Sequence, residues 1–240
     1  MAREAREAEV KKRKRNRTIR NGAIAVAVFV IAVVLVTVFT HKDKSNSNAS
    51  TSTSTPATTV PKNTHQTAPP VTIDPKKTYT ADISTTYGDI KVALDAKDAP
   101  KGVNNFVHLA RQGFYDGLTW HRLVKGFVIQ GGDPEGNGNG GPGYTIVTEL
   151  PKDGYPLGTL AWAKTSDAPA GSAGSQFFIT TVNQSPSLQK EGGSYQYGVF
   201  GHVQSGMPVV KKIESYAPNT PEGGAPAQPI YIKKVTITET

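Results

Sequence analysis

Two short runs of the sequence bring together residue types that could do chemistry. Residues 120–133 place Arg122 among aromatic and apolar residues, and residues 174–180 read Gly-Ser-Gln-Phe-Phe-Ile-Thr. A guanidinium holds several hydrogen-bond donors in a rigid plane, so it can stabilise a polarised carbonyl group. Aromatic side chains nearby can form an apolar pocket. Such a set could bind and polarise a substrate without forming a covalent bond to it.

The sequence offers little for other kinds of catalysis. It contains no cysteine, which excludes disulfides, thiolate catalysis and cysteine-based zinc sites. Ser175 has no matching His/Asp partner set, and the five histidines show no spacing typical of metal ligands. The glycine-rich run 136–143 lacks the Lys-Ser/Thr ending and the following helix of a phosphate-binding loop. We therefore expect no metal and no cofactor.

The positive charge of the chain is concentrated at its N-terminal end. Residues 1–21 carry nine Lys/Arg and three Glu, a net charge of +6, whereas residues 78–240 carry thirteen basic and fourteen acidic residues, a net charge of −1. A nucleic-acid-binding protein needs a basic face on its folded domain. The composition offers none, so we expect no nucleic-acid partner.

An uncharged, apolar segment follows the basic N-terminal segment. Residues 22–40 are long enough to cross the hydrocarbon core of a membrane as one helix, which takes about 20 residues. A cleaved signal peptide is the alternative, but the apolar run is long for one and the exit lacks a clean Ala-x-Ala site. The sequence therefore favours a retained, single-pass transmembrane helix. The basic excess before it predicts that residues 1–21 are cytoplasmic and the rest is extracytoplasmic.

Residues 41–77 form a third region with a different composition. They are rich in Ser, Thr, Asn and Pro and contain almost no large apolar residues. Such a segment buries too little surface to offset the entropy lost on ordering. It is predicted to be a disordered linker, and we expect a single folded domain over residues 78–240.

Local patterns in this domain predict many short strands and two helices. Alternating apolar residues indicate a hairpin over residues 79–94. A helix is expected from Pro100, with Asp98 as its N-cap and Gly113 at its end. Further strands are predicted near 119–123, 127–131, 158–163, 176–181 and 199–202. A second helix is predicted near 208–215, and a last strand over 230–238. A phase shift between Ile232 and Val235 predicts a β-bulge. The pattern is typical of a mainly β barrel or sandwich.

The runs 120–133 and 174–180, with the glycine loop 136–144 between them, resemble cyclophilin-type peptidyl-prolyl cis-trans isomerases. The resemblance covers about residues 78–240. It implies a closed eight-stranded antiparallel barrel capped by two α-helices.

The resemblance also implies the roles of individual residues. Arg122, Phe127 and Gln130 match the catalytic positions. The residues that match substrate-binding positions are Val128, Ala163, Lys164, Gln176, Phe178, Leu188 and Tyr197. Lys164 stands where the family often has asparagine, and Tyr197 where many eukaryotic members have histidine. The run 136–143 is interpreted as a loop at the rim of the substrate groove.

Each of these residues has an ordinary structural explanation when it is taken alone. An arginine among aromatic residues usually covers them with its aliphatic stem, here Tyr115 or Trp120. The apolar residues would be core, and Gln130 would be a polar residue at a strand end. The matched spacing across the two runs favours the interpretation that these residues form a substrate pocket.

The sequence thus predicts a membrane-anchored isomerase that assists the folding of extracytoplasmic proteins and acts on proline-containing polypeptides. We expect its isomerase domain to be monomeric. The alternative is a catalytically weak cyclophilin-like module that binds proline-containing segments as a scaffold or chaperone. Retention of Arg122, Phe127, Gln130 and Phe178 favours the enzyme.

Overall fold

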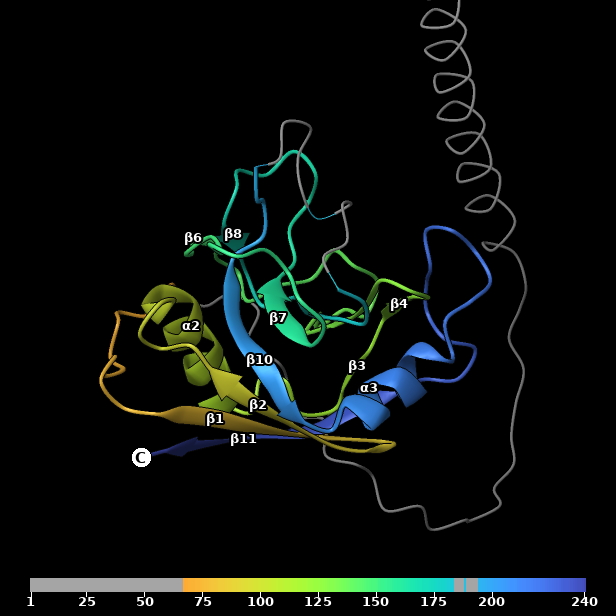
Figure 1. Cartoon of the computed structure of the whole chain (residues 1–240), viewed down its shortest axis with the longest axis horizontal. Coiled ribbons are helices and arrows are strands. Elements are labelled where there is room, and N and C mark those ends of the chain that lie inside the picture. The colour runs from red at the N-terminus through yellow and green to blue at the C-terminus, as the bar shows by residue number, and fades with distance from the viewer. Residues whose placement is uncertain (1–66, 184–187, 189–193) are drawn as a thin grey trace, which may run out of the picture. The chain divides into compact units, whose positions relative to one another are not determined.

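The computed structural model describes residues 67–183, 188 and 194–240 (Figure 1). The predicted tail 1–21, the predicted transmembrane helix 22–40 and most of the predicted linker lie outside these residues. Of the helices that the model does describe, none combines the length and the apolar character needed to cross a membrane.

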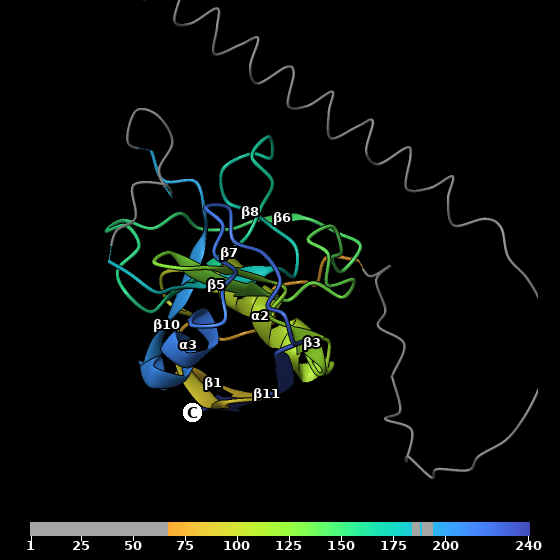
Figure 2. The same cartoon turned by 90° about the vertical axis from the view of Figure 1, so that its right-hand side faces the viewer.

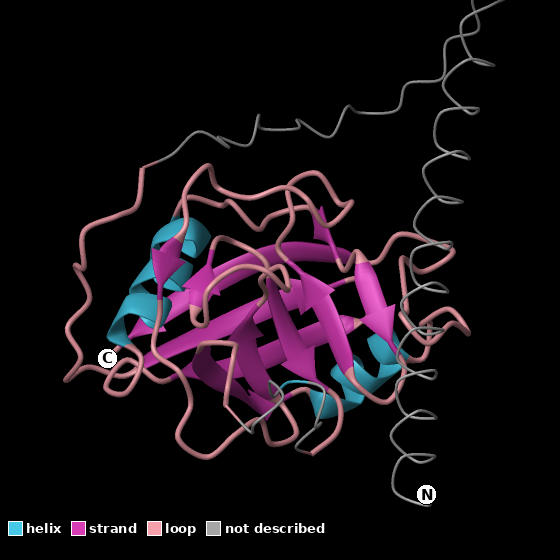
Figure 3. Cartoon of the chain, turned by 90° about the horizontal axis from the view of Figure 1, so that it is seen from above, coloured by secondary structure: helices cyan, strands magenta, loops and turns pink. Residues whose placement is uncertain are grey.

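The described chain is mainly β-structure with two helices. In chain order, the elements are β1 (Tyr79–Thr85), β2 (Gly88–Leu94), α2 (Pro100–Arg111), β3 (Leu118–Thr119), β4 (Arg122–Val124), β5 (Val128–Gly131), β6 (Ile146–Val147), β7 (Thr159–Trp162), β8 (Ser172–Ala173), β9 (Phe177–Thr180), β10 (Val199–Ser205), α3 (Met207–Glu214) and β11 (Tyr231–Glu239). The two helices lie at opposite sides of the sheet (Figure 3). The short pair β6 and β8, which the sequence patterns did not predict, forms a separate ribbon (Figure 2).

The main sheet is strongly curled but is not the closed eight-stranded barrel that was predicted. It has nine strands in the order β3-β11-β1-β2-β10-β7-β9-β5-β4, and the terminal strands β3 and β4 do not pair with each other in the described residues. The predicted strand 119–123 is in fact divided. Thr119 pairs with Tyr231 on β11, whereas Arg122 pairs with Gln130 on β5. The ends of the sheet are therefore joined by the chain itself and not by a ladder of hydrogen bonds.

The predicted hairpin and bulge are confirmed. Along β1, residues Tyr79, Ala81 and Ile83 are fully buried and alternate with partly exposed residues, because successive strand side chains point to opposite faces. In the pairing of β1 with β11, Ser84 faces Lys234 but the next residue, Thr85, faces Ile232. The skipped Lys233 produces the phase shift seen in the sequence.

Helix α2 forms where it was predicted and buries Val103, Phe106, Val107 and Ala110, but its N-cap differs from the prediction. The N-cap is Ala99, and no side chain caps the helix from that position. The carboxylate of Glu149, from a distant loop, instead accepts hydrogen bonds from the backbone N–H groups of Lys101 (3.1 Å) and Gly102 (3.2 Å). These are donors that a helix leaves free at its start. Beyond the helix end, Gly113 has a φ of 68°, as expected for a residue that ends a helix.

Aromatic rings form the centre of the core beneath α2. Phe106 is fully buried, and its ring contacts the rings of Tyr115, Trp162, Phe177 and Phe200. There is also a second, smaller apolar cluster. Its members are Val124, Val128, Tyr155, Ala161, Phe178 and Leu188. Several predicted site residues belong to this second cluster, so the same packing builds the candidate pocket.

Part of the predicted linker packs on the domain. The buried side chain of Asn104 on α2 accepts hydrogen bonds from the backbone N–H groups of Thr72 (2.8 Å) and Ile73 (3.3 Å) and donates to the carbonyl of Pro70 (3.0 Å). Ile73 is buried in the main core. The chain is therefore held to α2 before the first strand begins.

Candidate active site

A groove of about 660 Å³ lies above the second apolar cluster. It is lined by nine of the ten predicted site residues: Arg122, Phe127, Val128, Gln130, Ala163, Lys164, Phe178, Leu188 and Tyr197. The tenth, Gln176, lines an adjoining groove of about 810 Å³. Gln130, Ala163 and Lys164 line both grooves. The fold therefore gathers all the predicted site residues at one place.

The strand register explains how this happens. Arg122 on β4 faces Gln130 on β5, Gln130 faces Phe178 on β9, and Phe178 faces Ala161 on β7. Directly opposite residues of neighbouring antiparallel strands have side chains on the same face. Four short strands thus place an arginine, a glutamine and a phenylalanine in one row.

A chain of hydrogen bonds links the arginine to the glycine loop. Arg122 Nη1 donates to Gln130 Oε1 (3.1 Å), and Gln130 Nε2 donates to Gln176 Oε1 (3.0 Å). Gln176 Nε2 donates in turn to the carbonyls of Gly138 (2.9 Å) and Gly140 (2.8 Å). The two side-chain amides therefore have fixed orientations, and they hold the guanidinium at the edge of the groove.

The apolar part of the groove is formed by well-packed side chains. Val128, Phe178 and Leu188 are almost completely buried. The ring of Tyr197 stands edge-on to Phe178, with 5.5 Å between ring centroids. Tyr155 holds this segment, because its hydroxyl accepts hydrogen bonds from the backbone N–H groups of Gln196 and Tyr197 and donates to the carbonyl of Tyr197. Tyr197 thus closes one side of a preformed apolar pocket.

Asp133 organises the glycine loop, a role that the sequence analysis missed. Its buried carboxylate accepts hydrogen bonds from the backbone N–H groups of Glu135, Asn137 and Gly138. Aspartate often bonds backbone N–H groups a few residues ahead in turns, so its place before a glycine-rich run was the available signal. Residues 136–138 line the groove, as expected for a loop at its rim.

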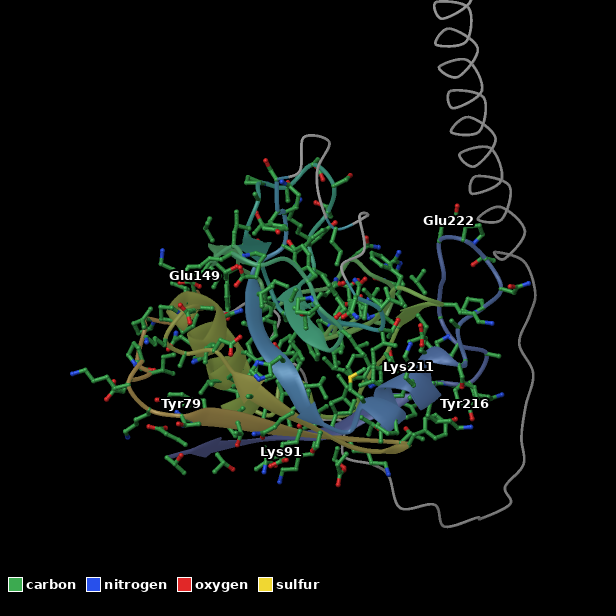
Figure 4. All side chains as sticks on the ribbon, viewed as in Figure 1. Tyr79, Lys91, Glu149, Lys211, Tyr216 and Glu222 are labelled. Carbon is green, nitrogen blue, oxygen red and sulfur yellow. The ribbon has the colours of Figure 1, made fainter. Side chains whose placement is uncertain are left out.

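A second missed segment, residues 222–225, forms the far rim of the groove. It belongs to the loop after α3, on which Glu222 is labelled (Figure 4). Leu123 and Gly224 exchange two backbone hydrogen bonds, of 2.8 and 3.1 Å, which hold the loop beside β4. A Cβ atom on Gly223 would collide with the carbonyl oxygen of Leu123. No local sequence pattern marks this long-range pairing.

His121 also lines the groove and was not predicted as a site residue. It is only 7% exposed. Burial lowers the pKa of its imidazole, and the nearby charge of Arg122 acts in the same direction, while Asp133 opposes them. The ring is therefore neutral at neutral pH, and it adds no positive charge beside Arg122.

Lys164 supplies a second positive charge where the two grooves meet. Its Nζ donates to the carbonyls of Ala168 (2.9 Å) and Thr165 (3.1 Å) and lies 5.4 Å from the centroid of the Tyr197 ring. The preceding residue, Ala163, donates its backbone N–H to the carbonyl of Gln176 (2.9 Å). The loop carbonyls thus hold the ammonium group beside the pocket.

The chain is similar to known proteins of one family. The model of the cyclophilin type peptidyl-prolyl cis-trans isomerase family matches residues 80–237. The chain belongs to this family. As a cyclophilin-type protein, it is an enzyme of the peptidyl-prolyl cis-trans isomerase class.

Several curated peptidyl-prolyl cis-trans isomerases are similar to this chain over most of their own length. Peptidyl-prolyl cis-trans isomerase A of Mycobacterium tuberculosis is 39% identical over 187 residues, which cover 70% of this chain and 97% of the relative. A peptidyl-prolyl cis-trans isomerase of Helicobacter pylori is 42% identical over 142 residues, covering 58% and 82% of the two chains.

Among solved structures, a cyclophilin type peptidyl-prolyl cis-trans isomerase of Cryptosporidium parvum in the presence of the dipeptide Ala-Pro aligns with a TM-score of 0.58 and 32% identity. The alignment covers 67% of this chain and 99% of that one.

Proposed function

We propose that this cyclophilin is a membrane-tethered isomerase that assists the folding of extracytoplasmic proteins by acting on their X-Pro bonds. The proposed catalytic activity rests on one observation: the chain of hydrogen bonds Arg122–Gln130–Gln176 lies beside an apolar pocket. A structurally similar cyclophilin was solved in the presence of Ala-Pro, which supports proline-containing polypeptides as substrates.

The proposed mechanism is electrostatic and makes no covalent bond. The partial double bond of an amide sets a rotational barrier of ~18–20 kcal/mol. The proline ring enters the apolar pocket beside Phe127, Phe178 and Leu188. Arg122 then donates hydrogen bonds that stabilise the twisted, non-planar amide more than the planar one. Only an interaction that is stronger in the twisted state accelerates rotation.

The hydrogen bond to Gln130 prepares Arg122 for this role. A guanidinium has five N–H donors in fixed directions. Within the described part of the chain, the bond to Gln130 is its only hydrogen bond. One donor therefore orients the group, and the others remain available to the substrate without rearrangement when the bond twists.

The alternative is a cyclophilin-like module that binds proline-containing segments and catalyses weakly. Such a module would need the apolar pocket but not an oriented arginine. The position of Arg122 in the groove, already held by Gln130, favours the enzyme. The two functions differ in whether peptide binding is accompanied by faster isomerisation.

The sequence supports the membrane part of the proposal. Residues 22–40 are uncharged and long enough to cross a membrane, and the +6 charge of residues 1–21 favours a cytoplasmic N-terminus. Protease added to intact spheroplasts should therefore digest the isomerase domain and spare a tag placed before residue 1. A cytoplasmic marker protein serves as the control for lysis. A domain protected until the membrane is dissolved, or a mature N-terminus near His41, would contradict the proposed topology or the retained anchor.

Lys164 should influence which sequences the enzyme prefers. An ammonium group at the groove favours an acidic side chain next to the proline, and a partly exposed ion pair corresponds to about a two- to fivefold preference. We expect kcat/KM to be higher for Glu-Pro than for Lys-Pro peptides, and Lys164→Asn to remove most of this difference. NMR exchange measurements on the two peptides test this expectation.

The matched control is Lys152→Asn, which removes a lysine whose ammonium pairs with Asp98 at the surface. It should leave the preference unchanged. If Lys164→Asn and the unmodified enzyme rank the peptides alike, Lys164 does not set the preference.

A further inference from the structure

Glu214, near the end of α3, is a buried carboxylate that lines neither groove. It is only 7% exposed, whereas its neighbours Lys212 and Ser215 are exposed. Burial raises the pKa of this carboxyl, but hydrogen bonds from Thr181, Lys211 and Gly126 outweigh the burial, so the pKa lies below its usual range. The group is therefore ionised at neutral pH. A buried charge is costly unless it is paired, so its partners are informative.

The donors come from three separate segments. Glu214 Oε1 accepts from the backbone N–H of Gly126 (2.7 Å) and from Thr181 Oγ1 (2.6 Å), and Oε2 accepts from Lys211 Nζ (2.9 Å). Lys211 Nζ also donates to the carbonyl of Thr181 (2.6 Å). Lys211 is labelled on α3 in Figure 4. Helix α3 is thus tied to the β4–β5 turn and to the end of β9.

These ties converge on the backbone of Phe127. Gly126 immediately precedes Phe127, with a φ of 70° that suits a glycine. Thr181 donates its backbone N–H to the carbonyl of Phe127 (2.8 Å). Two of the residues that Glu214 binds therefore hold Phe127: Gly126 fixes the backbone immediately before it, and Thr181 binds its carbonyl.

We propose that Glu214, supported by Lys211, is a positioning residue for the isomerase reaction, which fixes Phe127 at the wall of the proline pocket. The proposal rests on the proposed function through the role of Phe127. Glu214 does not touch the substrate and acts only through Gly126 and Thr181. A shift of about 1 Å in a group that positions the substrate can cost up to a hundredfold in rate.

The test compares variants of the full chain, purified in a mild detergent. Glu214→Ala removes the acceptor for Gly126 and Thr181, whereas Glu214→Gln keeps an amide oxygen for them and loses the charge. Lys212→Ala is the matched control, because it removes an exposed charge from the same helix. The ammonium group of Lys212 lies 5.2 Å from the centroid of the Tyr216 ring and 6.0 Å from that of Tyr87. All variants are assayed at a temperature where circular dichroism shows them folded.

We expect Glu214→Ala to lower kcat/KM for an Ala-Pro peptide by about ten- to a hundredfold. The affinity for the peptide, measured by NMR titration, should also fall. Faster hydrogen exchange should be confined to the amides of Gly126, Phe127 and Thr181. Glu214→Gln should recover most of the activity, and Lys212→Ala should match the unmodified enzyme. A merely structural role would lower the melting temperature but leave binding by the folded protein unchanged.

A folded Glu214→Ala variant with the activity and peptide affinity of Lys212→Ala would overturn the proposal. If Glu214→Ala does not fold, Thr181→Val provides the test, since it removes one hydrogen bond to the carboxylate and keeps the side-chain shape. We then expect kcat/KM to fall two- to tenfold, which corresponds to roughly one hydrogen bond. An unchanged kcat/KM in this variant would overturn the proposal. An inactive unmodified enzyme would instead refute the proposed function.

Discussion

Replacing Arg122 with alanine should lower kcat/KM for an X-Pro peptide by about two to three orders of magnitude while the fold persists. The loss of one preorganised donor that stabilises a transition state typically costs ~2.7–4 kcal/mol. Arg122 stands in the groove with its guanidinium held by Gln130, so the variant removes the cation without removing the apolar pocket. A protease-coupled assay or NMR exchange spectroscopy measures the rate.

Arg111→Ala is the matched control for this variant. Arg111 lies at the end of α2, and its guanidinium pairs with Glu239 at the surface. Such pairs contribute about 0–1 kcal/mol to stability, so the activity of this control should be unchanged. An Arg122→Ala protein with the rate of the control and an unchanged circular dichroism spectrum would show that Arg122 is not the catalytic cation. Normal peptide binding with a low rate in the unmodified protein would favour the weakly catalytic alternative.

Replacing Phe106 with alanine should destabilise the domain by about 3–5 kcal/mol, the typical cost of truncating a buried phenylalanine. The ring is fully buried, and its centroid lies 5.0 Å from that of Tyr115 and 5.1 Å from that of Phe200. The cavity would border several large rings that can move little, so only a small part of it can close. Urea unfolding followed by tryptophan fluorescence measures the change in the free energy of unfolding.

Leu157→Ala provides the comparison, because Leu157 is 45% exposed and its truncation leaves no buried cavity. We expect it to change the free energy of unfolding by about 0.5 kcal/mol or less, as for most surface substitutions. A loss of less than about 1 kcal/mol in Phe106→Ala would mean that neighbouring rings collapse into the space. In that case, the aromatic core would be more adaptable than its packing indicates.

Local patterns were sufficient for the hairpin of β1 and β2 and for the bulge in β11. The alternation of Tyr79, Ala81 and Ile83 marked a half-buried strand, and the structure buries these three side chains. The phase shift in the last strand marked the bulge at Lys233. These features could be predicted from the sequence because strand and helix periodicities depend on residues that are close together in the chain.

The site residues were identified by resemblance to a family, and the structure shows why their spacing matters. Gln130 and Gln176 are 46 residues apart and become hydrogen-bonded only because β5 pairs with β9. Neither glutamine has a local signal that distinguishes it from a surface residue. The same is true of Glu214, whose partner Gly126 is 88 residues away.

The sequence by itself determined the periodicity of the strands and helices and the positions of most elements, and its resemblance to a family indicated the residues of the pocket. The tertiary structure alone decided the division of the strand at His121, the capping of α2 by Glu149 in place of Asp98, and the packing of residues 222–225 against β4. The physical reason is that a backbone or side-chain polar group needs a partner but does not specify which one. The free N–H groups at the start of α2 and the backbone of Leu123 acquire their partners, Glu149 and Gly224, only when the curled sheet brings these distant segments together.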